Sequence, residues 1–262
     1  PRFAVHFRRR AAELRAAAFS HSGLLDAWVG GDLDIEGDLR ALFRAGMRGG
    51  YGRPNLLVAE RNRLHEIARS NATREQAKIN ARAHYGLPAD FYRLWLDDPL
   101  MMYTCAYWRE GVATLEAAQA AKIDHVCRKL RLARGERVVD IGCGFGGFMF
   151  RAAAREHVHV TGVNTTTEQV AFVAAGIRAR ALDDRHAVVE CDFRDACGTF
   201  DKVVSIGVLE HAGRDQLAEV VRAHAAFLAP GGLGLLHFIG HVGRRDTEFF
   251  IREHVFPGGW IP

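Results

Sequence analysis

Long apolar runs are absent from the sequence, and no stretch approaches the roughly 20 residues that a helix needs to cross a bilayer. The N-terminal stretch PRFAVHFRRR lacks the apolar core of a signal peptide, and its first proline predicts a natural start further upstream. The five cysteines are odd in number and include no C-x-x-C pair, which argues against a disulfide framework or a zinc ribbon. We therefore expect no metal site and a reducing, cytoplasmic environment.

Net charge is small and unevenly placed. The 262 residues are 48% hydrophobic and 25% charged, as in an ordinary globular chain, with a net charge of +4. Residues 1–83 hold 15 Lys and Arg against 9 Asp and Glu, whereas residues 84–262 hold 20 against 22. The basic N-terminal part fits an anionic lipid surface, a nucleic acid or plain solvation.

Glycines are concentrated in one stretch, DIGCGFGGF, which follows the β-branched residues Val138 and Val139. The pattern predicts a buried strand, a tight glycine turn and a helix whose positive N-terminal end faces a ligand. A glycine-rich turn alone is weak evidence, because dinucleotide-binding enzymes use a similar one. No Gly-Lys-Ser/Thr follows, which excludes a Walker loop. The D-x-G-x-G-x-G spacing, with Asp140 before the first glycine, is typical of S-adenosylmethionine (SAM)-dependent methyltransferases.

Strands and helices alternate through the rest of the chain. We expect strands at 137–142, 157–163, 187–190, 202–207 and 233–239. Helices are expected at 114–130, 148–156, 167–182 and 214–228. This alternation predicts an α/β fold, the class I SAM-methyltransferase (Rossmann-like) architecture, with a mostly parallel sheet and helices on both faces. Such a sheet normally has two more strands after the fifth, so we also expect that C-terminal strands are missing from this chain.

The sequence predicts two domains. We expect residues 1–83 to form a smaller domain that is mostly helical and basic. Residues 84–262 are expected to form the catalytic domain, truncated at its C-terminus. Within the first, 38–47 is an amphipathic helix whose apolar face either packs on the main domain or contacts an apolar substrate. GGYGRP at 49–54 is the expected flexible connection, and a helix is expected from 56 to 83.

Aromatic and histidine side chains crowd residues 83–108, which Pro99 divides into a helix and a loop. Such density favours a lid over an apolar site, and ordinary core aromatics are the alternative. Past this segment, polar residues follow the strand ends. Asn164, Thr165 and Gln169 are placed to hold a ribose, where nucleotide-binding folds often use an acidic residue. Asp192 either accepts from an adenine amino group or caps the next turn.

Three further polar residues are candidates for chemistry. Glu210, followed by His211, comes just after the fourth strand, where active sites of α/β folds lie. His237 is flanked by Leu236 and Phe238 on the fifth strand, so it is either a core residue or a functional one. Together with Cys105 in the lid segment, Glu210 and His237 form a possible polar cluster facing the SAM methyl group.

The chain resembles the cyclopropane-fatty-acyl-phospholipid synthases, strongly over 84–262 and weakly over 1–83. The resemblance rests on seven collinear segments: HYGLPADFYRLWLDDPLMMYTCAYW, VVDIGCGFGGF, GVNTTTEQ, CDFRD, SIGVLEHAG, PGGLGLLHFIG and FPGGWIP. Members of this family transfer a methylene group from SAM to the double bond of an unsaturated phospholipid acyl chain. The resemblance therefore implies a lipid-modifying enzyme that is cytoplasmic and peripheral on the inner face of the membrane. The resemblance further implies that such an enzyme contacts anionic lipid, binds no nucleic acid and is a homodimer.

The resemblance also assigns site residues. It implies that SAM is held by the glycine loop, the strand tips and the lid, that is, by Tyr103, Thr104, Asp140, Gly142, Gly144, Gly146, Thr165, Gln169, Asp192 and Ile206. It implies a bicarbonate ion beside the reacting methyl group, acting as base, with Cys105, Glu210, His237 and the Ile239 backbone as its ligands. A further tyrosine ligand belongs to a C-terminal part that this chain lacks.

The chain departs from the family pattern in the lid. Gly86 stands where the family usually has an aspartate, and Pro88-Ala89 replaces the usual small turn. The product is therefore open between a cyclopropane and a methylene- or methyl-branched chain, the latter with a partner reductase. A small-molecule N-methyltransferase and a non-catalytic lipid-binding subunit are further alternatives. The presence of Cys105, Glu210 and His237 together disfavours both.

Overall fold

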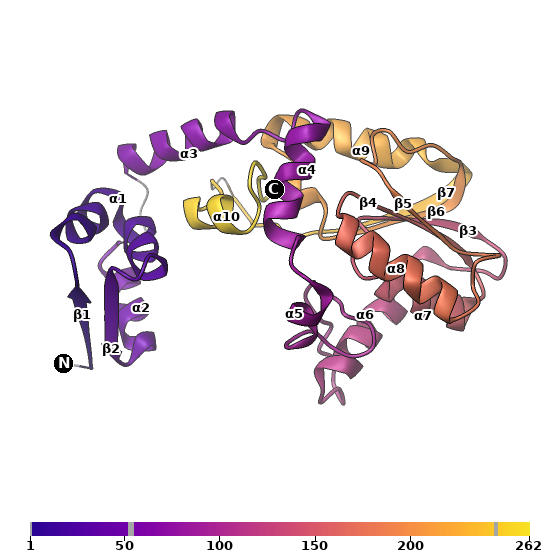
Figure 1. The fold of residues 1–262 in the computed structure, drawn as a ribbon, viewed down its shortest axis with the longest axis horizontal. Coiled ribbons are helices and arrows are strands. Elements are labelled where there is room, and N and C mark those ends of the chain that lie inside the picture. Colours follow the sequence, from indigo (N-terminus) through magenta and orange to yellow (C-terminus); the bar gives the residue numbers. More distant parts are fainter. Residues whose placement is uncertain (1, 52–54, 244–245) are drawn as a thin grey trace. The chain divides into compact units, whose positions relative to one another are not determined.

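The computed structural model describes residues 2–51, 55–243 and 246–262 (Figure 1). Contacts divide the chain into two compact units. The first comprises Pro1–Ser70 and Arg245–Gly258, and the second Asn71–Arg244 and Gly259–Pro262. In the part of the chain that is described, no helix is both long enough and apolar enough to cross a membrane.

The second unit is built on a five-stranded sheet in the order β5-β4-β3-β6-β7 (Figure 1). All four neighbouring pairs are parallel. The strands are β3 (Arg137–Ile141), β4 (His159–Asn164), β5 (Ala187–Glu190), β6 (Phe200–Ile206) and β7 (Leu228–His237). Since β4 and β6 flank β3 on opposite sides, the strand order reverses at β3, and ligands bind at such switch points. The predicted class I methyltransferase fold is confirmed.

Helices cover both faces of this sheet, because side chains alternate along each strand. Val138 faces a core with α6 (Leu115–Leu130), α7 (Gly147–Glu156) and α8 (Thr167–Ala179). Val139 faces the opposite core, which contains Phe227 at the end of α9 (Leu217–Ala226). Figure 1 shows α9 apart from α7 and α8 across the sheet.

Some element boundaries differ from those predicted. The helix expected at 214–228 is a short 3₁₀ turn (Arg214–Gln216) followed by α9. The fifth strand begins at Leu228 rather than 233, and Leu228 pairs with Phe200 before a register shift. Pro230, Gly231 and Gly232 therefore lie within β7 rather than before it.

The helix predicted at 56–83 is two helices. α3 (Leu56–Ala68) belongs to the first unit, and α4 (Arg74–Tyr85) belongs to the second. Thr73 begins α4, because its side chain accepts a hydrogen bond from the Gln76 N–H. The short helix α5 (Ala89–Arg93) follows.

The first unit contains two strands that were not predicted from the sequence. β1 (Phe3–Phe7) and β2 (Leu33–Gly37) pair antiparallel, and α1 (Arg10–Val29) connects them. The predicted amphipathic helix is α2 (Leu39–Arg48). Of the predicted flexible connection, residues 52–54 lie outside the described residues. α10 (Phe249–His254) completes the unit by contacting α1 and α3.

Candidate active site

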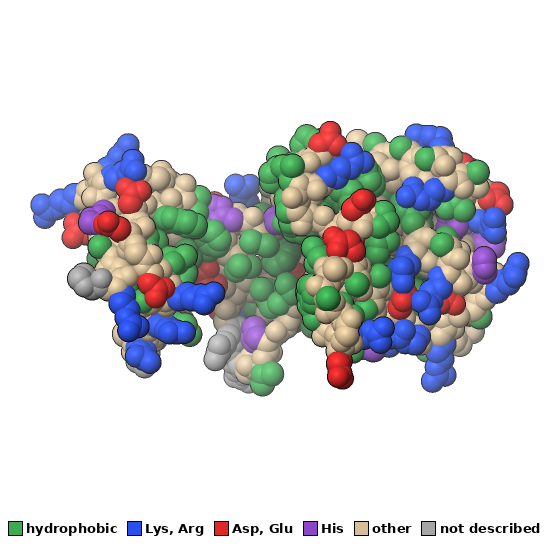
Figure 2. Space-filling view, turned by 90° about the horizontal axis from the view of Figure 1, so that it is seen from below, with side chains coloured by type: hydrophobic (Ala, Val, Ile, Leu, Met, Phe, Trp, Pro, Cys, Tyr) green, Lys and Arg blue, Asp and Glu red, His purple; other side chains and the backbone are tan. Residues whose placement is uncertain are grey.

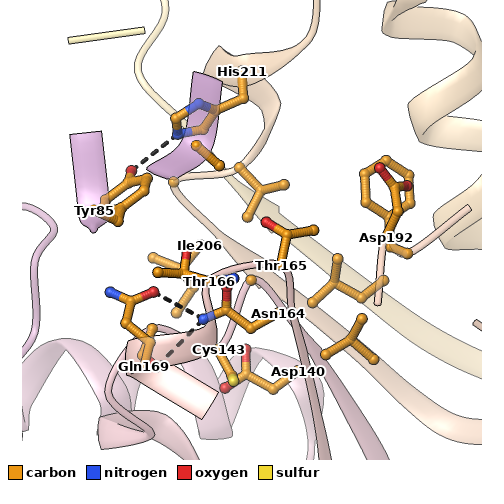
Figure 3. Close-up of a pocket in the computed structure, with 18 of the residues that line it drawn as sticks. Tyr85, Asp140, Cys143, Asn164, Thr165, Thr166, Gln169, Asp192, Ile206 and His211 are labelled. Atoms are coloured by element: carbon orange, nitrogen blue, oxygen red, sulfur yellow. Dashed lines mark hydrogen bonds between the residues drawn. The ribbon is translucent and has the colours of Figure 1, made fainter. Parts of the chain in front are cut away.

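A pocket opens in the second unit where β3, β4 and β6 end (Figure 3). Nine of the ten predicted cofactor residues line it: Tyr103, Thr104, Asp140, Gly142, Gly144, Thr165, Gln169, Asp192 and Ile206. Gly146 lies outside the lining. It caps α7 with φ +81°, and a Cβ there would meet the Phe150 ring at 2.8 Å. In this structure, position 146 therefore requires glycine because of the positive φ at the start of α7 and the close packing of Phe150.

The glycine turn leaves space that side chains would fill. Gly142 has φ +73°, and a Cβ on it would lie 2.3 Å from Val208 Cγ2. Gly144 has φ +54° and nothing within 4 Å of its Cβ position. Gly207, directly after β6, has φ +74°, and a Cβ on it would lie 2.8 Å from Thr104 Cγ2. Positive φ values suit glycine, so the backbone itself forms this pocket wall.

Asp140 is the acidic group of the pocket. Its side chain is 2% exposed, and its Oδ2 has no hydrogen-bond partner among the described residues. Burial raises the pKa of this carboxyl to about 7, because a charge in an apolar surrounding is disfavoured. An unpartnered buried acceptor beside a glycine turn fits a ligand that brings donors or positive charge.

At the tip of β4, Asn164 and Gln169 are bound to one another. The Asn164 Nδ2 donates to Gln169 Oε1 over 2.9 Å, and Asn164 Oδ1 accepts from the Thr166 N–H over 3.1 Å (Figure 3). These bonds fix the orientation of both amides. Thr165 between them lines the pocket. The predicted ribose-binding residues are thus brought together as one rigid group.

Asp192 forms an ion pair with Arg194, which was not predicted from the sequence. Arg194 donates to both carboxylate oxygens over 2.8 and 2.7 Å, and its N–H adds a third bond over 2.9 Å. Although burial opposes it, this pairing holds the pKa of Asp192 below its usual value. The Arg194 guanidinium also donates to the Asn71 carbonyl. A ligand amine that donates to Asp192 would therefore have to share its carboxylate oxygens with Arg194.

Polar side chains of α6 hold the lid segment by hydrogen bonds. Gln119 Nε2 donates to the carbonyls of Met102 and Thr104, and Lys122 Nζ donates to Thr104 Oγ1 over 2.6 Å. The Met102 N–H donates to Asp97 Oδ1. Above these bonds, the aromatic rings of the lid pack on Tyr103 and Phe145. The segment thus contains a buried aromatic cluster, and its residues Tyr103 and Thr104 line the pocket. Its role as a lid stays a prediction.

The four predicted catalytic residues form two pairs next to the pocket lining. Glu210 Oε1 accepts from the Ile239 N–H over 2.7 Å. Cys105 Sγ and His237 Nε2 lie 3.7 Å apart, which is hydrogen-bond distance for sulfur. None of the four lines the pocket, but Cys105 follows Thr104 in the chain, and the Gly207 N–H donates to the His237 carbonyl.

Burial shifts the protonation of these groups toward neutrality. Glu210 is 1% exposed, and burial raises its pKa, while its Oε2 has no partner in the described part of the chain. Burial, with the nearby Lys122 charge, lowers the pKa of His237. Both shifts favour the neutral form of the group, since burial disfavours the charged form.

A second pair of acid–base groups was not predicted from the sequence. The Tyr85 hydroxyl and His211 Nε2 lie 2.9 Å apart at the pocket wall (Figure 3). Burial lowers the pKa of His211 to about 4 and raises that of Tyr85, so both are neutral. The sequence does contain a signal for this pair, because Tyr85 is the second residue of the first family-like segment and His211 follows Glu210. Across the described ranges no cluster of His, Cys, Asp or Glu is arranged to hold a metal ion.

Comparison with known families decides the affiliation. The model of the mycolic acid cyclopropane synthetase family matches residues 72–262. The chain belongs to this family. The match begins at the second unit, which contains the whole pocket and both residue pairs.

Curated relatives agree with this affiliation. A protein described as a probable fatty acid methyltransferase of Pseudomonas putida is 38% identical over 245 residues, which is 90% of this chain and 60% of the relative. The cyclopropane-fatty-acyl-phospholipid synthase of Escherichia coli K12 is 37% identical over 191 residues, 72% of this chain and 48% of that protein. The chain thus spans about half to three fifths of the length of these relatives.

Solved structures show the same fold. The cyclopropane synthase MmaA2 from Mycobacterium tuberculosis aligns with a TM-score of 0.66 and 35% identity, covering 71% of this chain and 70% of that one. The mycolic acid cyclopropane synthase CmaA1, in a complex with S-adenosylhomocysteine (SAH) and CTAB, aligns with a TM-score of 0.65 and 32% identity. It covers 71% of this chain and 70% of that structure.

Proposed function

We propose that this protein transfers a methylene group from SAM to the double bond of unsaturated acyl chains of membrane phospholipids, giving cyclopropane fatty acids. One observation carries the proposal: a glycine-walled pocket lies directly beside the Cys105–His237 and Glu210–Ile239 pairs in a single unit. The named activities of the Escherichia coli and Mycobacterium tuberculosis relatives support it.

The pocket fits SAM. When bound, SAM supplies an electrophilic methyl group. The glycine turn admits the cofactor close to the backbone, and Asp140 Oδ2 offers an acceptor that has no other partner in the described ranges. The Asn164–Gln169 group and Thr165 would orient the ribose, and Ile206 gives the adenine an apolar wall. Fixing the reactants at short distance supplies much of the rate for a poor nucleophile such as an alkene.

Acid–base groups of the chain itself would take up the proton that the reaction releases. Addition of a methyl group to the double bond leaves a carbocation on the acyl chain, and ring closure releases one proton from that methyl group. His237 is neutral and can take this proton, while Glu210 is buried and held by Ile239 N. The resemblance implies that bicarbonate binds here as base. His237 Nδ1 and Glu210 Oε2 fit it, being without partners in the described chain, whereas Ile239 N is already engaged.

An exposed apolar and basic surface on α2 of the first unit supports the membrane part of the proposal. On α2, Leu39, Phe43 and Met47 form one ridge, and these side chains are 44%, 55% and 80% exposed. Arg40, Arg44 and Arg48 form the adjoining ridge at the same spacing. An apolar stripe beside arginines is suited to lie in the interface of an anionic membrane. Figure 2 shows hydrophobic and Lys or Arg side chains side by side on this unit. We further propose that the protein is a homodimer and that it acts at the cytoplasmic face of the membrane.

A second candidate product rests on the Pseudomonas putida relative. Its name is that of a fatty acid methyltransferase, and its similarity extends over 90% of this chain. In that case a hydride shifts from the methyl-bearing carbon to the cationic carbon, and the resulting tertiary cation loses a proton from the added methyl group. This gives a methylene branch that a partner reductase would convert to a methyl branch. The coclaurine N-methyltransferase structure, at 23% identity, shares the fold alone and adds no support for amine substrates.

The test incubates the protein with SAM and vesicles of mono-unsaturated phospholipid, and examines the acyl products by NMR. High-field cyclopropane protons support the synthase, whereas vinylidene protons support the branching enzyme. Glu210→Gln should lower turnover about 100-fold or more while SAM affinity in calorimetry is retained. Asp215→Asn, an exposed carboxylate five residues on, is the matched control and should retain full turnover. The absence of any lipid product with SAM bound would overturn the proposal.

A further inference from the structure

A second pocket of the second unit, here called the arginine pocket, lies outside the candidate active site. It has a volume of about 400 Å³ and lies between Pro99 and Leu100 of the lid segment, α7 and the residue that ends α8. Its lining includes Arg151, Arg155 and Arg180, and no acidic residue of the described chain lines it. A pocket of this size and charge is suited to a small anionic ligand.

Two of the three arginines are oriented by carboxylates that lie outside the pocket lining. Arg151 donates to both oxygens of Asp124 on α6, from Nε over 2.7 Å and from Nη2 over 2.8 Å. Arg155 donates to Asp124 from Nη1 over 2.7 Å, and to Glu156 from Nε over 3.1 Å. These bonds balance the two charges and fix the planes of both guanidinium groups. Arg151 Nη1 and Arg155 Nη2 form no hydrogen bond to a described residue, so they remain available to a ligand.

Arg180 gives the arginine pocket its excess positive charge. Its guanidinium carbon lies 4.3 Å from the centroid of the Phe150 ring, and its Nη1 donates to the Gly176 carbonyl over 3.1 Å. Gly176 leaves room for this arrangement, because a Cβ there would lie 2.7 Å from Phe150 Cζ and 3.2 Å from Arg180 Nη1. In the described ranges Arg180 has no carboxylate partner. The ring and the carbonyl therefore position the guanidinium without neutralising it.

We propose that the arginine pocket binds a phosphate group, carried either by a phospholipid headgroup or by a small free phosphate. Guanidinium groups bind phosphate through paired N–H donors, and groups that are oriented in advance lose less freedom on binding. Leu100, Phe150 and Ala154 also give the pocket an apolar side, which suits a ligand in which hydrocarbon adjoins the phosphate. This inference goes beyond the proposed function, since binding requires neither SAM nor turnover.

The arginine pocket and the glycine-walled pocket are formed by the same two segments of the chain. Leu100 lines the arginine pocket, and the next residue, Met101, lines the glycine-walled one. On α7, Phe148 lines the glycine-walled pocket, and Arg151 lines the other. Phe148 and Arg151 are three residues apart, which is about 5 Å along the helix axis. The two pockets are therefore neighbours, and one phospholipid molecule is long enough to reach both.

The test titrates the protein with inorganic phosphate and, separately, with monomeric dihexanoylphosphatidylglycerol. Two-dimensional proton–nitrogen NMR follows the arginine Nε–H signals, and the Arg180 signal is assigned with Arg180→Lys. This signal should shift until it saturates, and Arg180→Met should weaken binding about tenfold. Arg180→Lys keeps the charge but loses the paired donors, so it should weaken binding about threefold. Arg178→Met is the matched control, because Arg178 is exposed in the last turn of α8 outside the pocket lining.

Each outcome of the titration has a defined meaning. Stronger binding of the lipid than of inorganic phosphate identifies the ligand as a phospholipid headgroup, whereas equal binding identifies it as a small free phosphate. SAM affinity in calorimetry shows that each variant is folded. A titration without saturation, or an equal loss of affinity in Arg178→Met and Arg180→Met, would overturn the proposal, because it indicates general attraction of anions to a basic surface. The readout requires no lipid product, so it is separate from the test of the proposed function.

Discussion

The glycine turn after β3 illustrates how two similar residues are required for different reasons. Gly142 and Gly144 both have positive φ, so any side chain there is strained. Only Gly142 is also crowded, because a Cβ on it would lie 2.3 Å from Val208 Cγ2. At Gly144 the space beyond the backbone is open. Backbone strain and overpacking can therefore be separated by substitution at these two positions.

Gly144→Ala should lower the free energy of unfolding by about 1 kcal/mol from the left-handed backbone alone. Gly142→Ala should lower it by about 2 to 4 kcal/mol, because overpacking against Val208 adds to the same strain. Urea unfolding of both variants without ligand gives the comparison. Equal losses would mean that Val208 moves aside freely.

Two buried titratable groups at the pocket give opposite pH dependences. The folded-state pKa of Asp140, about 7, is above its unfolded value, so its contribution to stability is lost as pH rises from about 4 to 7. The folded-state pKa of His211, about 4, is below its unfolded value, so stability is lost as pH falls from about 6.5 to 4. In the wild type the two slopes partly cancel.

Asp140→Asn should therefore become more stable relative to the wild type as pH rises from about 4 to 7. His211→Gln should become more stable relative to the wild type as pH falls over nearly the same range. Denaturant unfolding of the ligand-free proteins at several pH values measures both differences. A difference that stays constant with pH, in either variant, would show that the group titrates normally in the folded state.

At the scale of elements, α10 joins the helices of the first unit. Phe249 is 4% exposed, with the Arg61 guanidinium 3.5 Å from its ring centroid and the His65 ring edge-on. The fully buried Arg252 pairs with Asp246 and with Glu66 of α3. A short helix near the end of the sequence thus supplies apolar and ionic contacts to elements near its start.

Phe249→Ala should lower the free energy of unfolding of the first unit by about 3 to 5 kcal/mol, because a large ring leaves a cavity under Arg61. Hydrogen exchange resolved by mass spectrometry should show loss of protection in α1 and α3, with the strands of the second unit unaffected. Phe43→Ala, at an exposed ring on α2, is the control and should change little. Uniform loss across both units would contradict this account.

Local signals explain which elements could be predicted. The strands of the parallel sheet are runs such as Val138 and Val139, whose burial on both faces makes them apolar throughout. The break between α3 and α4 was missed, because the Thr73 cap lies within a sequence that is otherwise helical in pattern. β1 and β2 were missed because their pairing spans a 20-residue helix and leaves no hairpin turn to recognise.

The site was predictable in its residue types but not in its pairings. Nine expected cofactor residues converge because the carboxyl ends of parallel strands meet at one edge. The Arg194 clamp on Asp192 depends on side-chain geometry that spacing does not specify. Lys122 could have been found, since it lies four residues from both Ala118 and Val126 on the apolar face of its helix.

At the scale of the whole molecule, the proposed activity requires access to lipid. Phe43→Glu with Met47→Glu should weaken binding to anionic vesicles about tenfold or more, because the exposed ridge of α2 would lose its apolar contact. Raising NaCl to about 0.5 M should weaken wild-type binding as well. Vesicle co-sedimentation measures both effects, with Val29→Glu, exposed at the end of α1, as the control. Unaltered binding of the double variant would exclude α2 as the contact.

The discontinuous first unit has a consequence for synthesis on the ribosome. Its residues up to Ser70 leave the ribosome early, but α10, which packs on α1 and α3, emerges only after residues 71–244 of the second unit. At about 5 to 20 residues per second, the early segment waits roughly 10 to 40 s for its missing helix. During that interval the apolar surfaces of α1 and α3 that α10 later covers are exposed to solvent and to chaperones. The unit whose translation begins first is therefore completed only after most of the second unit has been translated.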